Sequence, residues 1–234
     1  MNSVADSITS SHAAAPREAP RTPTVALVED DLSVQDCLGA ALGARGYVVR
    51  PFDSAEAFLR SAPGFDTLCC VVVDLHLRGS SGWEVIGGLR DVAPHSGLVV
   101  VSAHLDVRSV VRAMLAGASA VLEKPVCLDE FLDAVRRGCE NAEHSRRQER
   151  LRIDAGERLA RLSAREREVF DRVVAGLASK NIAFELGISI RTVEAFRSRI
   201  LSKTGARSTA ELVRLDLLAR GKDEGALPPP PTLD

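Results

Sequence analysis

Aromatic residues are scarce in this chain, with 7 Phe, 1 Tyr and 1 Trp among 234 residues. The core is therefore expected to consist mainly of Leu, Val, Ala and Ile. No apolar run approaches the roughly 20 residues that a membrane-spanning helix needs. Residues 1–22 are rich in Ser, Ala and Pro and lack the apolar segment of a secretory signal peptide. These absences lead us to expect a cytoplasmic protein that does not act in a membrane.

The chain also lacks the cysteine spacings that are typical of metal sites and redox motifs. Its five cysteines are Cys37, Cys69, Cys70, Cys127 and Cys139. Cys69 and Cys70 begin the apolar run over residues 69–73. We therefore interpret this pair as small buried hydrophobic residues rather than as redox sensors.

Charge is divided unequally along the chain, although the net charge is only −2. Residues 24–126 contain 8 Lys and Arg against 12 Asp and Glu, a net charge of −4. Residues 145–222 contain 18 against 10, a net charge of +8. The length and the 45% apolar composition suit one large globular domain or two ordinary ones. The basic part is expected to bind nucleic acid.

In the acidic part, short apolar runs alternate with amphipathic segments of helical period. The runs cover residues 25–28, 48–52, 69–73, 98–101 and 120–122. Such alternation is typical of βαβ units. We therefore predict an α/β fold with a doubly wound, five-stranded parallel sheet.

Four of these runs end in charged or hydroxyl-bearing residues: Glu29 and Asp30, Asp74, Ser102, and Lys124. The carboxyl ends of parallel strands meet at one edge of the sheet, where ligands bind. Carboxylates, a hydroxyl and an ammonium group at one edge suit a divalent cation and a phosphoryl group. Taken singly, an acidic cluster also favours the start of a helix, and a lysine is usually a solvated charge.

From residue 162 onward the apolar pattern has only a helical period. Ser163 and Glu166 have the spacing of a capping box, and Gly187 separates two short helical segments. We predict four helices that contain a helix-turn-helix. Residues 142–158 are rich in Arg and Glu and are interpreted as a solvated helical linker rather than a coiled-coil seam. The tails, residues 1–22 and 223–234, are predicted to be disordered.

Residues 24–140 resemble the CheY-like (flavodoxin-like) receiver domain of bacterial response regulators. The resemblance is carried by Val28-Glu29-Asp30, Val73-Asp74, Ser80-Ser81-Gly82, Val101-Ser102-Ala103 and Glu123-Lys124-Pro125. It implies that Asp74 is the phosphoacceptor, that Ser102 and Lys124 bind the phosphoryl group, and that Mg²⁺ or Mn²⁺ is bound by Glu29, Asp30, Asp74 and the backbone carbonyl of His76. The side chain of His76 is given no role.

Three positions depart from the usual receiver pattern. Glu29 stands where the family often has Asp, and Arg78 replaces a common proline in the loop after the phosphoacceptor. Val121 stands where many receivers carry an aromatic residue that rotates with the switch hydroxyl. An output through the fourth helix, near residues 106–115, is expected instead.

Residues 162–218 resemble the LuxR-type helix-turn-helix of FixJ-like and NarL-like response regulators. The motifs on which this resemblance rests include Lys180-Asn181-Ile182-Ala183, Leu186-Gly187-Ile188-Ser189 and Arg191-Thr192-Val193-Glu194. We expect the helix over residues 190–204 to read base edges with Glu194, Ala195 and Ser198. The candidates for phosphate contacts are Lys180, Arg191, Thr192, Arg199 and Lys203. Phe196 replaces a common His and is expected to pack in the core.

Together these features predict a receiver over residues 23–141, a linker over 142–158 and a DNA-binding domain over 159–222. The predicted function is that of a two-component response regulator, not an enzyme. It would take a phosphoryl group from a histidine kinase and regulate transcription as a DNA-bound homodimer, in contact with RNA polymerase. One alternative is a phosphorylation-independent DNA-binding protein with a structural receiver. Another is an aspartyl-phosphate hydrolase, although Asp74-Leu75-His76 lacks the second carboxylate of a D-x-D motif.

Overall fold

A computed structural model describes residues 22–61 and 68–221 and divides the chain into two compact units, residues 1–139 and 140–234. The predicted disorder of the tails concerns residues that lie almost wholly outside these described ranges. Within the same ranges, no helix combines the length and the apolar character that crossing a membrane requires.

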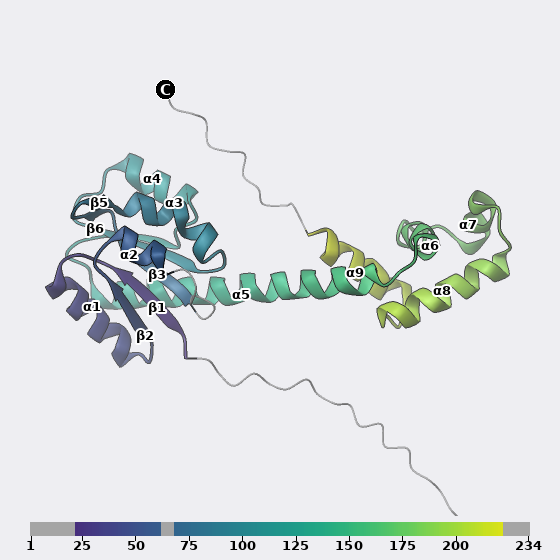
Figure 1. Cartoon of the computed structure of the whole chain (residues 1–234), viewed down its shortest axis with the longest axis horizontal. Helices are drawn as coiled ribbons and strands as arrows, with labels where there is room; N and C mark the ends of the chain where they lie inside the picture. The colour runs from purple at the N-terminus through teal and green to yellow at the C-terminus, as the bar shows by residue number, and fades with distance from the viewer. Residues whose placement is uncertain (1–21, 62–67, 222–234) are drawn as a thin grey trace, which may run out of the picture. The chain divides into compact units, whose positions relative to one another are not determined.

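The first unit is built on a five-stranded parallel sheet, in agreement with the sequence prediction (Figure 1). The strand order is β2 (Val48–Phe52), β1 (Thr24–Val28), β3 (Leu68–Asp74), β6 (Gly97–Ser102) and β7 (Ala120–Glu123). The sequence order reverses between β1 and β3, so the edge beyond these two strands is the expected binding crevice. A small antiparallel pair, β4 (His76–Leu77) and β5 (Ser80–Ser81), follows β3 and was not predicted.

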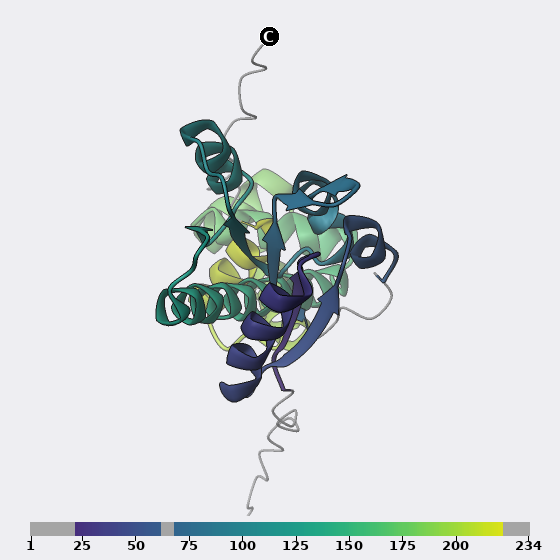
Figure 2. The ribbon, with the colours of Figure 1, turned by 90° about the vertical axis from the view of Figure 1, so that its left-hand side faces the viewer.

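Helices cover both faces of this sheet (Figures 1 and 2). One face carries α1 (Leu32–Ala44) and the first turns of α5 (Leu128–Ala160). The other carries α2 (Ala55–Arg60), α3 (Gly82–Val92) and α4 (Val107–Leu115). Residues of β1 alternate between the two cores, because successive side chains of a strand point to opposite faces. Val25 and Leu27 pack in one core, and Ala26 and Val28 in the other.

The cysteines differ in part from the sequence interpretation. Cys70 is buried and free, as predicted, and burial raises the pKa of its thiol to about 12. Cys69 is buried too, but it forms a disulfide with Cys139 of α5. The two residues are separated by 70 positions, and their Cα atoms lie 4.6 Å apart. The interpretation of Cys69 as a simple hydrophobic residue was therefore wrong.

The second unit contains the last turns of α5 followed by α6 (Ala164–Val174), α7 (Ser179–Leu186), α8 (Ile190–Thr204) and α9 (Thr209–Arg220). The predicted capping box is formed, because Ser163 and Glu166 bond to each other's backbone N–H. Gly187 ends α7 in the left-handed conformation (φ 64°), which favours glycine. The core includes Phe170, Val193 and Ile200, all fully buried. This arrangement agrees with the predicted helical fold.

The segment predicted as a solvated linker is partly buried. Ala155 of α5 is fully buried, and it packs with Leu159 in the core of the second unit. The Arg- and Glu-rich composition of α5 conceals this contact, because alanine contributes only a weak apolar signal. The last turns of α5 therefore belong structurally to the helical unit.

Candidate functional site

Three carboxylates converge at the crevice beyond β1 and β3. Asp74 ends β3, Glu29 and Asp30 directly follow β1, and one carboxylate oxygen from each lies within 4.8 Å of the others. Glu29 and Asp74 are almost completely buried, with 2% and 5% of their surface exposed. Asp31, the third acidic residue of the run, instead caps α1 by accepting hydrogen bonds from Ser33 N and Val34 N. The sequence cluster thus divides into a site and a helix cap.

Lys124 compensates part of this negative charge. It follows β7, and its Nζ lies 2.6 Å from Glu29 Oε2 and 2.7 Å from Asp74 Oδ2. Burial works to lower the pKa of Lys124, but its hydrogen bonds to Asp74 and Glu29 and their charges outweigh burial and raise that pKa. Burial is also the largest influence on Glu29, and it raises the pKa of that carboxyl group despite the contact with Lys124.

The Lys124 ammonium therefore stays charged and holds two carboxylates in fixed positions. Oxygen atoms of three acidic side chains at this spacing form the donor set that Mg²⁺ prefers.

The loop after Asp74 contributes a backbone and a side-chain contact. The backbone N–H of His76 donates to Asp74 Oδ1 at 2.8 Å. The imidazole Nδ1 of His76 lies 2.8 Å from the hydroxyl of Ser102, which ends β6 and is fully buried. The sequence interpretation gave this imidazole no role and did not anticipate its contact with Ser102. No local sequence pattern around His76 indicates a contact with Ser102, which lies 26 positions further along the chain.

Arg78 makes a second contact that the sequence did not indicate. Its Nε lies 3.0 Å from Asp30 Oδ2, although the arginine side chain is 84% exposed. Arg78 leads into the tight turn at Gly79 between β4 and β5 (φ 79°). In the sequence, Arg78 is visible only as a departure from the receiver pattern. The structure places its guanidinium group against a predicted metal ligand.

The candidate DNA-reading face is the exposed side of α8. Val193 and Ile200 face the core, whereas Arg191, Thr192, Glu194, Ala195, Ser198 and Arg199 are exposed. Glu194 Oε1 accepts a hydrogen bond from Ser179 Oγ of α7 at 2.5 Å. Phe196 packs against the core, as predicted, and the guanidinium group of Arg199 lies over its ring at 5.5 Å. The fold thus presents small and polar side chains on one helix face.

The remaining phosphate candidates lie in different settings. Lys180 is exposed on α7. The hydroxyl of Thr192 shares a hydrogen bond with that of Ser189 at the start of α8. Lys203 Nζ pairs with Glu166 Oε2 at 2.7 Å, and this bond, followed by the backbone N–H of Ser163, lowers the pKa of Glu166 to about 2. Lys203 therefore has a structural partner inside the unit.

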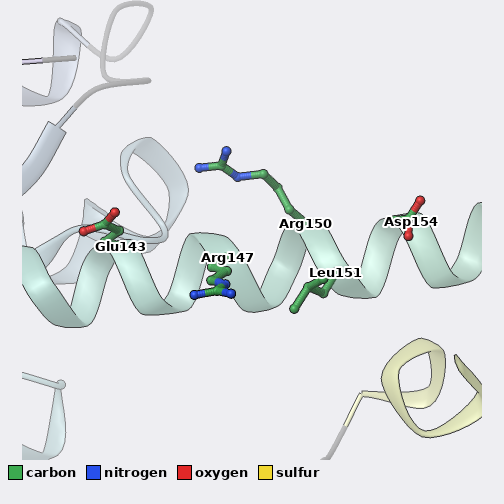
Figure 3. A pocket seen from close by; sticks show the side chains of 5 residues that line it. All are labelled: Glu143, Arg147, Arg150, Leu151 and Asp154. Atoms are coloured by element: carbon green, nitrogen blue, oxygen red, sulfur yellow. The ribbon is translucent and has the colours of Figure 1, made fainter. Parts of the chain in front are cut away.

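A shallow hollow beside α5 does not form a comparable site. Its lining consists of Glu143, Arg147, Arg150, Leu151 and Asp154, all from α5 (Figure 3). Their side chains project in several directions around one helix (Figure 3). A single helix cannot surround a ligand, so the hollow supports no binding assignment.

Both parts of the chain match known protein families. Residues 25–136 match the family described as "Response regulator receiver domain", and residues 160–215 match "Bacterial regulatory proteins, luxR family".

The chain is 40% identical over 200 residues to the transcriptional regulatory protein FixJ of Azorhizobium caulinodans, a match that covers 86% of this chain and 94% of that protein. It is 38% identical over 196 residues to the transcriptional regulatory protein TdiR of Thauera aromatica, covering 81% and 83%.

Solved structures show the same architecture. The response regulator StyR is 35% identical, with a TM-score of 0.73 over 84% of this chain and 98% of that one. Full-length FixJ from B. japonicum is also 35% identical, with a TM-score of 0.52 over 85% and 97%. Both family matches, the full-length relatives and the described geometry agree. The chain belongs to the FixJ-type two-component response regulators, which regulate transcription through a phosphorylatable receiver and a luxR-family DNA-binding domain.

Proposed function

We propose that Asp74 accepts a phosphoryl group from a phosphohistidine of a cognate histidine kinase. The observation that carries this proposal is the pairing of Asp74 Oδ2 with Lys124 Nζ at 2.7 Å in the crevice beyond β3. A carboxylate oxygen of Asp74 attacks phosphorus while the bond from phosphorus to the imidazole nitrogen breaks. The ammonium group of Lys124 is already placed to pair with the phosphoryl oxygens, which costs no reorganisation during the reaction.

The three carboxylates and the backbone carbonyl of His76 are the proposed ligands of Mg²⁺ or Mn²⁺. The support is the close approach of Glu29, Asp30 and Asp74, whose oxygens suit a hard divalent cation. Glu29 Oε2 is engaged by Lys124, and Oε1 accepts a hydrogen bond from Asp31 N. Glu29 therefore acts directly or through a water molecule. When bound, the ion neutralises charge on the transferred oxygens.

Ser102 and α4 form the proposed switch. The Ser102 hydroxyl lies against His76 Nδ1 and exchanges this partner for a phosphoryl oxygen once Asp74 is modified. The exchange draws in the loop that connects β6 to α4. Val121 carries no aromatic ring that would follow Ser102, so α4 transmits the change. Only Ala113 of α4 is fully buried, which leaves the helix able to shift.

An apolar face on α4 supports a homodimer of the phosphorylated form. Val107 is 81% exposed, and Val111 and Met114 are each 50% exposed. Their spacing of four and three residues places them on one side of the helix. An exposed apolar stripe of this kind is typical of an association surface. We propose that a second copy of the chain covers it, which brings two DNA-binding units together.

The DNA-binding unit is proposed to place α8 in the major groove. Glu194 accepts from a cytosine amino group, Ala195 contacts a thymine methyl group and Ser198 permits close approach. Five further residues are proposed to hold phosphates, namely Lys180, Arg191, Thr192, Arg199 and Lys203. A dimer binds two half-sites and thereby strengthens weak single contacts. Contact with RNA polymerase is the proposed output.

The family also supports proposals about the location of the protein, its lack of enzymatic activity and its domain division. We propose a cytoplasmic regulator that has no enzymatic activity of its own beyond phosphoryl acceptance. The proposed division is a receiver over residues 23–141, a linker over 142–158 that contributes Ala155 to the core of the helical unit, and a DNA-binding domain over 159–222.

The test is the intact mass of the full chain after incubation with Mg²⁺ and acetyl phosphate, with size-exclusion chromatography and light scattering in parallel. We expect a single phosphoryl adduct and a shift towards a dimer. Asp74→Asn should abolish the adduct. Asp91→Asn, which neutralises an exposed carboxylate near the end of α3, should leave it unchanged. An Asp74→Asn protein that is still fully phosphorylated would exclude Asp74 as the acceptor.

The alternative function, DNA binding independent of phosphorylation, is tested with the same material. Equal DNA affinity with and without the phosphodonor would favour it. The buried, cation-paired Asp74 argues for the phosphorylated switch, because a purely structural receiver has no need for a buried acidic cluster.

A further inference from the structure

The acidic site carries two internal cations, and they divide the three carboxylates between them. Lys124 Nζ contacts Glu29 and Asp74, whereas Arg78 Nε contacts Asp30 Oδ2 at 3.0 Å. Two positive charges thus offset two of the three negative charges, which leaves one net negative charge at the site. Among the described residues, Arg78 is the cation that pairs with Asp30. Arg78 therefore pairs with Asp30, the carboxylate of the site that Lys124 does not contact.

We propose that Arg78 is a built-in competitor of the metal ion for Asp30. This inference rests on the metal site proposed above. Mg²⁺ draws its carboxylate ligands tightly around it, at about 2.0–2.1 Å. A guanidinium group on the same carboxylate repels the arriving divalent charge and occupies Oδ2, one of the two oxygens that Asp30 can offer the ion. Withdrawal of Arg78 from Asp30 therefore favours metal binding.

The environment of Arg78 allows such a withdrawal. Its side chain is 84% exposed, so the guanidinium group can turn into water without leaving a buried charge. Asp30 is only 14% exposed, so its carboxylate stays at the site when Arg78 leaves. The short β4–β5 turn at Gly79 holds the arginine backbone beside the crevice. Arg78 thus acts as a tethered, exchangeable counter-ion.

The size of the effect follows from the exposure of the pair. An ion pair with one exposed partner is weak, so removing it should strengthen Mg²⁺ binding by about two- to fivefold. The effect should shrink in high salt, because salt screens the repulsion between Arg78 and the ion.

The experiment is isothermal titration calorimetry of Mg²⁺ into the full, unphosphorylated chain without any phosphodonor. Wild type is compared with Arg78→Ala, with Arg78→Gln, which keeps a polar side chain but no charge, and with Arg60→Ala. Arg60 is an exposed arginine at the end of α2, so its variant controls for the loss of one positive charge.

We expect the Mg²⁺ dissociation constant to fall about two- to fivefold for both Arg78 variants, and to stay within experimental error of wild type for Arg60→Ala. An unchanged or weaker affinity in the Arg78 variants, with wild type binding Mg²⁺, would overturn the competition. An equal gain in Arg60→Ala would also overturn it, because net charge alone would then explain the result. Absence of Mg²⁺ binding in all four proteins would instead refute the proposed metal site.

Discussion

Gly82 leaves no room for a side chain beside the proposed phosphoacceptor. It is the first residue of α3, and its N–H donates to Leu75 O at 3.1 Å. A Cβ atom at this position would lie 2.1 Å from the carbonyl oxygen of Asp74, and 2.8 Å from both Asp74 C and Leu75 Cα. All three are backbone atoms, so no side-chain rotation can relieve the overlap. Gly82→Ala therefore forces the Asp74 backbone or the start of α3 to move.

The size of this movement sets the expected loss of reactivity. Cβ atoms essentially never come closer than 3.0 Å to a non-bonded heavy atom, so the overlap requires a displacement of about 0.9 Å. A misplacement of about 1 Å in a reacting group can cost roughly 100-fold in rate. The contacts of Asp74 with Lys124 Nζ and His76 N would be disturbed by the same movement. We expect phosphorylation of Gly82→Ala by acetyl phosphate to be slowed about 100-fold.

Gly87→Ala is the matched control in the same helix. A Cβ atom at Gly87 meets nothing within 4 Å. The variant should be phosphorylated at the wild-type rate and be stabilised by about 0.5–1 kcal/mol, because alanine is the better helix former. The rate of adduct formation by intact mass measures the chemistry, and circular dichroism checks that both variants keep their helices. A folded Gly82→Ala protein phosphorylated within twofold of wild type would refute the steric argument.

Three further outcomes are expected. A maleimide should label three cysteines of the denatured chain without reductant and five after reduction. Labelling of all five cysteines without reductant would contradict the Cys69–Cys139 disulfide. Phe170→Ala should destabilise the second unit by about 3–5 kcal/mol in urea unfolding, because it empties a fully buried position, and a cost below about 1 kcal/mol would contradict that packing. The pKa of Glu166 is lowered from its ordinary value of 4.5 to about 2. The ionised carboxylate therefore stabilises this unit fully above the ordinary pKa of 4.5, and this contribution is lost as the pH falls towards about 2. Glu166→Gln should therefore lower the urea midpoint at neutral pH, with the difference from wild type closing by pH 2, and a difference that does not change with pH would exclude the ionic contribution.

The sequence by itself predicted the five strands of the parallel sheet and the chemistry of the crevice, although not the small β4–β5 pair. The alternation of apolar runs with helical segments required five parallel strands, because each pattern reflects short-range geometry that repeats along the chain. Once the strands are parallel, their carboxyl ends share one edge, so Asp74, Glu29 and Lys124 were expected to meet there. The Ser163–Glu166 capping box and the turn at Gly187 were equally local, since each depends on residues at most a few positions apart.

Only the tertiary structure decided which side chains touch across long separations. The disulfide joins residues 70 positions apart, and the contact between His76 and Ser102 spans 26. Arg78 looks like any exposed loop arginine until the fold brings Asp30, from another strand, beside it. The burial of Ala155 was likewise hidden in a polar helix. Periodicity fixes the face of a helix or strand on which a side chain lies. The partner of that side chain depends on how separate elements pack, and no local sequence pattern encodes this packing.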